Sequence, residues 1–141
     1  MKHFIKLLAL VLFFSVAAIA EDYNRDVQLT PLLKTDATSI GQKLVYPNPD
    51  NGEVTIMKVT LPPGKETGWH KHGFSVFAYV LQGTLTIELD GKKMEFAEGS
   101  SFAEVINTFH NGKNLGKKDV VLIAVFLGEK GKPLSEKKED K

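Results

Sequence analysis

The chain has 141 residues, enough for one domain, and its 43% hydrophobic and 25% charged residues are typical of a globular protein. The formal net charge of +1 argues against the broad basic surface of a nucleic-acid-binding protein, so no nucleic-acid partner is expected. The absence of cysteine excludes a disulfide scaffold, thiol catalysis and cysteine-ligated zinc.

The first 20 residues have the three-part layout of a secretory signal peptide. Lys2 and Lys6 supply positive charge, an apolar run follows, and Ala18 and Ala20 form a small-residue cleavage site. The apolar stretch 7–20 is shorter than the roughly 20 residues that cross a bilayer, which disfavours the alternative of a retained anchor. We therefore expect a protein secreted across the inner membrane, periplasmic, with no membrane contact after cleavage.

The remaining sequence predicts an all-β domain. Residues 21–40 form a polar N-terminal arm, residues 41–128 form the domain, and the charged residues 129–141 are expected to be a disordered tail. Short runs of β-branched and aromatic residues alternate with turn residues, and no segment has a capped helical period. The expected strands are 43–46, 53–61, 74–81, 84–89, 92–97, 100–106 and 119–127.

Three histidines outside the signal peptide are candidate metal ligands. His70 and His72 are two residues apart, so on a strand their side chains face the same side, and His110 follows a later turn. Imidazole nitrogens are common ligands of Fe, Zn, Mn and Ni, so the three residues predict a site for one divalent metal ion of unknown identity.

Two segments around these histidines resemble the paired motifs of the cupin superfamily. The matching residues are Gly64, His70, His72 and Gly83 in the first motif, and Gly99, His110 and Asn114 in the second. The resemblance implies a single cupin domain of the second type over residues 41–128. Its implied fold is a cupin double-stranded β-helix, a jelly-roll-like barrel with the site inside.

The sequence departs from the motifs at three positions. Val76 stands where the first motif has a metal-binding glutamate, and Val105 and Asn107 replace the proline and glycine of the second. Asparagine tolerates a left-handed backbone, so Asn107 is compatible with the turn. Glu104 is a candidate fourth ligand from another strand, and its alternative role is a solvent-facing strand residue. Phe74 and Val76 share the parity of the histidine pair, so they are expected to line the pocket.

These features are compatible with two main functions. The first is a metal-dependent cupin enzyme acting on a small organic molecule, with a dioxygenase-like reaction favoured within the family. The alternative is a non-catalytic cupin module of the cell envelope that binds a small ligand or a metal. A purely structural barrel is disfavoured because all three histidines stand in the motif frame. Family habit and the polar arm also suggest a homodimer.

Overall fold

The computed structural model describes residues 27–139, and these residues form β-strands and loops without a helix. The predicted signal peptide and the start of the arm lie outside the described residues. Within them, no helix of membrane-spanning length and apolarity is present. Contacts divide the chain into Met1–Thr30 and Pro31–Lys141, and the second unit contains every described strand.

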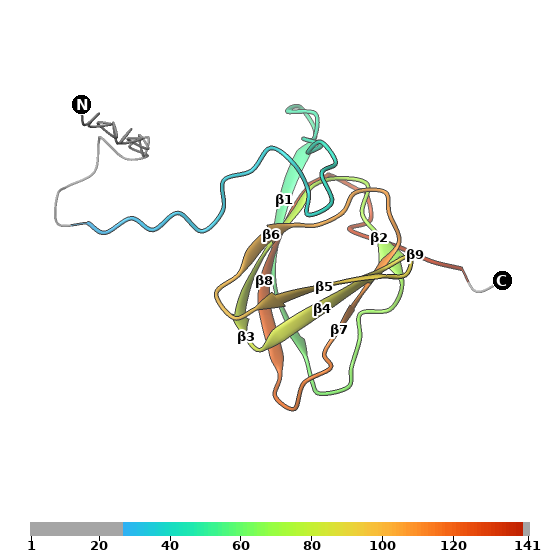
Figure 1. The fold of residues 1–141 in the computed structure, drawn as a ribbon. Coiled ribbons are helices and arrows are strands. Elements are labelled where there is room, and N and C mark those ends of the chain that lie inside the picture. Colours follow the sequence, from blue (N-terminus) through green and yellow to red (C-terminus); the bar gives the residue numbers. More distant parts are fainter. Residues whose placement is uncertain (1–26, 140–141) are drawn as a thin grey trace, which may run out of the picture. The chain divides into compact units, whose positions relative to one another are not determined.

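The strands form two antiparallel sheets that face each other (Figure 1). The four-stranded sheet has the order β1-β8-β3-β6, and the five-stranded sheet has the order β5-β4-β7-β2-β9. Most neighbours are not consecutive in sequence, which is the jelly-roll-like connectivity expected of the cupin barrel. The strands are β1 (Gly52–Leu61), β2 (His70–Lys71), β3 (Val76–Gln82), β4 (Thr84–Leu89), β5 (Lys92–Ala97), β6 (Ser101–Ala103), β7 (His110–Lys113), β8 (Val120–Glu129) and β9 (Glu136–Lys137).

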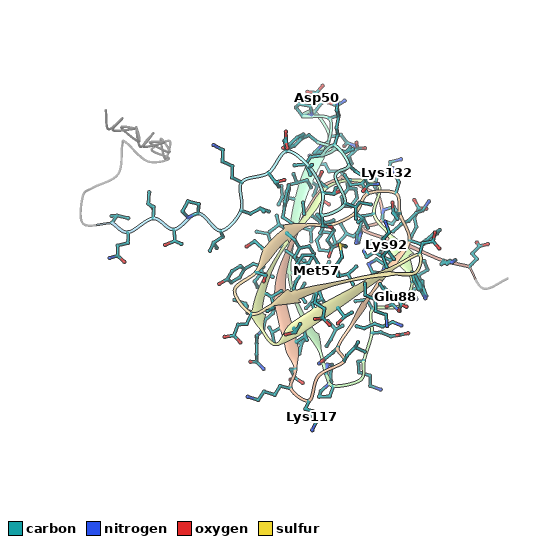
Figure 2. The ribbon with its side chains drawn as sticks, viewed as in Figure 1. Asp50, Met57, Glu88, Lys92, Lys117 and Lys132 are labelled. Atoms are coloured by element: carbon teal, nitrogen blue, oxygen red, sulfur yellow. The ribbon has the colours of Figure 1, made fainter. Side chains whose placement is uncertain are left out.

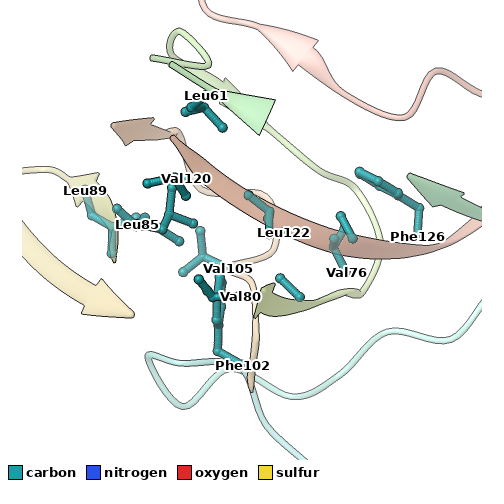
Figure 3. Close-up of a cluster of buried hydrophobic side chains, with 13 residues drawn as sticks. Leu61, Val76, Val80, Leu85, Leu89, Phe102, Val105, Val120, Leu122 and Phe126 are labelled. Atoms are coloured by element: carbon teal, nitrogen blue, oxygen red, sulfur yellow. The ribbon is translucent and has the colours of Figure 1, made fainter. Parts of the chain in front are cut away.

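The hydrophobic core lies between the sheets because each inner strand turns alternate apolar side chains inward. On β3, Val76 and Val80 are opposite Phe126 and Leu122 of β8, and all four side chains are buried (Figure 3). Residues directly opposite each other in an antiparallel pair project on the same face, so these side chains stack as one layer. The alternating residues of β4 cover them from the other sheet.

Charged residues lie in the turns at both ends of the barrel. Asp50 lies in the turn before β1, and Lys117 lies in the turn between β7 and β8 at the opposite end (Figure 2). One glycine is required for close approach: Gly83, with a φ of +79°, lies so near β8 that a Cβ would be 2.8 Å from the Asp119 carbonyl oxygen. This contact fixes the turn from β3 into β4.

Two sequence expectations need correction. Residues 43–46 do not form a strand; Lys43 makes one isolated bridge, to Ala37. The tail is not disordered throughout, because β8 continues to Glu129 and residues 136–137 pair with β2 as β9. Backbone pairing and a 3.1 Å salt bridge between Lys71 and Glu136 hold this charged segment, although it lacks an apolar pattern.

Part of the predicted N-terminal arm packs on the barrel. The backbone amide of Ser39 donates a 2.9 Å hydrogen bond to the carbonyl of Ala103. The side chain of Gln42 binds the backbone of Ile106 twice, through its amide nitrogen and its oxygen, each at 2.9 Å. The segment around these residues therefore lies against β6 and the loop that follows it.

Candidate metal centre

The three histidines converge although they come from separated parts of the chain. His70 and His110 lie directly opposite each other on β2 and β7, and His72 follows the end of β2. The ring centroids are 4.4 Å apart for His70 and His110, 4.9 Å for His70 and His72, and 5.2 Å for His72 and His110. One ligand nitrogen from each ring lies within 4.8 Å of the other two, so the cluster is positioned to bind a metal ion.

Each of these rings is oriented by a backbone carbonyl. The distance from Nδ1 to the carbonyl oxygen is 2.8 Å for His70 and Gly68, 2.7 Å for His72 and Leu134, and 3.0 Å for His110 and Thr108. A carbonyl oxygen only accepts, so Nδ1 carries the proton in every ring. In a neutral ring, Nε2 is therefore the nitrogen with a free lone pair. Metal-binding histidines in proteins commonly have this arrangement, with the other ring N–H donated to a backbone carbonyl.

His110 provides an independent indication that the site accepts a further group. Its side chain is only 2% exposed, and its Nε2 is buried without a hydrogen-bond partner. A buried polar atom without a partner costs roughly 1–3 kcal/mol. A metal ion bound at Nε2 would use this lone pair, so the donor set fits a divalent cation.

Glu104 lies beside the histidines. It follows β6, its side chain is 12% exposed, and its Oε2 lies 3.1 Å from Nε2 of His72 and 3.6 Å from Nε2 of His110. Burial alone raises the pKa of the Glu104 carboxyl, but the neighbouring His110 and His72 rings outweigh it and lower the pKa to about 2. The site therefore contains an ionised carboxylate within reach of two of the three imidazoles.

Two of the imidazoles differ in their proton affinity. Burial lowers the pKa of His72, but the Glu104 carboxylate and the Leu134 carbonyl outweigh it, so the pKa is raised above 6.5. Burial is also the largest effect on His70, where the other two imidazoles add to it, and the pKa of His70 is lowered. The Nε2 of His72 faces the Glu104 carboxylate, so the protonated form of His72 donates its Nε2–H to Glu104 from the metal-facing nitrogen.

A cavity of about 260 Å³ adjoins the three histidines. This volume is enough for a small organic molecule. Both sheets contribute apolar side chains to its wall, and Glu104 and Lys137 are the charged residues that line it. The apolar wall includes Met57, Val59, Leu85, Leu122 and Phe126.

The cupin family model, described as a cupin domain, matches residues 57–126, which include the four residues of the centre. The chain belongs to the cupin superfamily. No curated protein matches this cupin.

Several solved structures are similar to this cupin. A predicted oxalate decarboxylase from Thermotoga maritima is 26% identical, with a TM-score of 0.49 over 55% of this chain and 68% of that one. A cupin domain from Bordetella pertussis is 24% identical, with a TM-score of 0.47 over 53% and 81% of the two chains. A chain from a study of DMSP lyases is 17% identical, with a TM-score of 0.52 over 61% of this cupin and 44% of that chain, and it supports the fold alone.

Phe74 and Val76, which were expected to line the pocket, are absent from the residues that line the cavity. Val76 lies in the hydrophobic core, and the Phe74 ring packs against Gly128. The physical reason is that the chain leaves one sheet after β2 and enters the other at β3, so side-chain parity does not carry over from His72 to Val76.

Sequence reasoning missed the contribution of the C-terminal segment to the centre. Leu134 accepts the hydrogen bond from His72, and Ser135 and Lys137 line the cavity. All three lie beyond residue 126, where the match to the family model ends. No motif or apolar pattern marks the segment. A single apolar residue, Leu134, is too little to predict a strand there.

Proposed function

We propose that this cupin binds one divalent metal ion through His70, His72 and His110 and holds a small organic molecule beside it. The observation that supports this most strongly is that all three rings hold Nδ1 against backbone carbonyls, which leaves Nε2 free in each, while one ligand nitrogen of each ring lies within 4.8 Å of the others. Glu104 is the proposed fourth protein ligand because its Oε2 is the carboxylate atom beside these nitrogens.

The protein groups around the centre have distinct roles in this proposal. The three imidazoles are neutral when bound, and Glu104 adds one negative charge, so the centre keeps a net positive charge. A bound divalent metal would act as a Lewis acid toward an oxygen atom of the ligand. The apolar wall from Met57, Val59 and Leu122 restricts water and accommodates the hydrocarbon part of the molecule.

Elemental analysis of protein purified without a histidine tag tests the metal site. The expected result is close to one equivalent of metal per chain, lost in a His70→Ala, His72→Ala double variant. His3 lies in the predicted signal peptide, so a chain starting at Glu21 has no histidine outside the cluster to bind the metal. A metal content that the double variant does not change would overturn the assignment.

We also propose that the protein is exported and that its first 20 residues are removed. The charged start, the apolar run and the small residues before Glu21 support this. Expression in a bacterial host followed by mass measurement of the periplasmic fraction should give a chain beginning at Glu21. Recovery of the full chain from the cytoplasm alone would contradict export.

A homodimer is the proposed assembly. The outer strand β1 presents Val54 and Ile56 with 60% and 65% of their surface exposed, and its outer edge has no strand partner among the described residues. Exposed apolar side chains on an edge strand favour pairing with another chain. Sedimentation equilibrium at micromolar concentration should give twice the chain mass, and a monomer at that concentration would refute the dimer.

A further inference from the structure

The C-terminal strand β9 places a lysine in the same row as the metal-site histidines. Lys137 lies directly opposite His70, which in turn lies opposite His110, so the three residues form one row across β9, β2 and β7. Directly opposite residues of antiparallel strands project on the same face, with Cβ atoms roughly 4.5–5.5 Å apart. Lys137 therefore projects toward the cavity that it lines.

The residues on either side of Lys137, which are Glu136 in β9 and Lys138 just after it, project the other way and fasten the strand. Glu136 forms the 3.1 Å salt bridge with Lys71, and the Nζ of Lys138 lies 5.4 Å from the centroid of the Trp69 ring. The backbone amide of Lys138 also donates a 3.0 Å hydrogen bond to the Trp69 carbonyl. These contacts hold β9 in register, and the inward direction of Lys137 follows from that register.

The charge of Lys137 is not matched inside the described structure. Within residues 27–139, no carboxylate forms a salt bridge with it, whereas Lys71 and Lys113 each have a partner. With a divalent metal bound by neutral imidazoles, Glu104 is the one negative group at the cavity, and the metal and Lys137 leave an excess of positive charge. An anion between the metal and the ammonium would balance it.

We propose that Lys137 is a ligand-binding residue that, together with the metal, recognises the carboxylate end of a small aliphatic acid. This inference rests on the proposed metal site and adds to it the chemical class of the ligand. The carboxylate lies between the metal and the ammonium of Lys137, and the hydrocarbon chain packs on Met57, Val59 and Leu122. The cavity volume of about 260 Å³ limits the ligand to a short chain.

Titration of the Co²⁺-loaded protein with butyrate tests the proposal, with the visible absorption of the metal and the heat of binding as readouts. Lys137→Met keeps the apolar stem and removes the charge, and butyrate should bind about tenfold more weakly because one charge-assisted hydrogen bond is lost. Lys137→Arg should restore most of the affinity. The matched control is Lys130→Met, which removes an exposed lysine in the turn after β8 that does not line the cavity, and this variant should bind butyrate like the unaltered protein.

Two further comparisons isolate the charge. Butanol, which has the same chain length without a carboxylate, should bind the Lys137→Met variant and the unaltered protein equally. The tenfold difference for butyrate should shrink in 0.5 M salt, because the ammonium lies at the exposed mouth of the cavity, where salt screens it.

The outcomes separate this inference from the function on which it rests. If the unaltered protein holds no Co²⁺, the proposed metal site fails and the inference fails with it. If all variants hold Co²⁺ and Lys137→Met binds butyrate as tightly as the unaltered protein, the metal site stands and the role of Lys137 is refuted.

Discussion

The backbone amide of Glu104 donates a 2.8 Å hydrogen bond to the carbonyl of Val76, which places the two residues opposite each other on adjoining strands. They continue the pairing of Phe77 with Ala103 by one position. The first cupin motif has its glutamate at position 76, and here the carboxylate comes from the residue across the sheet. The chain therefore lacks the motif glutamate at position 76 but has the carboxylate of Glu104 on the neighbouring strand.

Exchanging these two residues tests the relationship. We expect Glu104→Val to weaken metal binding by about 10–100-fold, the range seen when a partner of a metal site is removed. Adding Val76→Glu to that variant should not recover the loss, because position 76 lies in the hydrophobic core and does not line the cavity. Competition with a chromophoric chelator measures the affinities. Equal affinity of Glu104→Val and the unaltered protein would show that Glu104 is not a ligand.

The ionisation of Glu104 predicts a pH-dependent stability in the metal-free protein. Its pKa is 4.5 when unperturbed and about 2 in the fold, so its contribution is complete above pH 4.5 and is lost as the pH falls toward 2. At about 1.4 kcal/mol per pKa unit, Glu104→Gln should cost about 3 kcal/mol at pH 7 and less than half of that at pH 3. Urea unfolding with chelator present measures both values, and a cost independent of pH would contradict the ion pair.

Metal binding should release protons from His72, because its raised pKa favours the protonated ring and its Nε2 faces the Glu104 carboxylate. The pKa of His72 is raised in the metal-free fold, so the protonated form persists to higher pH than in a free histidine, and its Nε2–H must leave before a metal binds. Metal affinity should therefore increase with pH until it passes the raised pKa. Calorimetry in two buffers of different ionisation enthalpy counts the protons released. Identical heats in both buffers would argue against a protonated His72.

Sequence patterns predicted the strands in which apolar residues alternate with polar ones or form a clear run between turn residues. The strand 84–89 was expected with these bounds, and the Asp90-Gly91 turn joins it to 92–97 as predicted. The strands β2, β7 and β9 are two to four residues long and largely polar, so they carry no period that could mark them. They are also the three strands that position the site.

The metal site was likewise predicted only in part from the sequence. The three histidines were identified from motif spacing, and the structure brings them together. The proximity of Glu104 depends on which residue lies opposite Val76, and cross-strand register is not encoded in the parity of either strand alone. The carbonyl of Leu134 belongs to a backbone group, which any residue type would supply, so no side-chain pattern predicts it.

Asn107 confirms the expected tolerance for a left-handed turn. Its φ is 51°, and among the described residues it is the one non-glycine with a positive φ. Its backbone amide donates a 2.8 Å hydrogen bond to the carbonyl of His72, so the turn also fixes a metal-site residue. Asn107→Gly should leave stability within about 0.5 kcal/mol, whereas Asn107→Val should cost about 1–2 kcal/mol. Equal urea midpoints for the two variants would contradict a backbone requirement at this position.

Removing the C-terminal segment should weaken the metal site without dissolving the barrel. A chain ending at Pro133 lacks the Leu134 carbonyl that accepts the hydrogen bond from His72 and lacks all of β9, while β1 to β8 remain. Without the acceptor, the His72 ring loses the contact that fixes its Nδ1–H, and metal affinity should decrease by about 10–100-fold. A chain ending at Lys138 keeps both features and serves as the control. Circular dichroism confirms that both chains retain the strands, and chelator competition compares their affinities. If the chain ending at Pro133 binds metal as tightly as the control, the Leu134 carbonyl does not support the site.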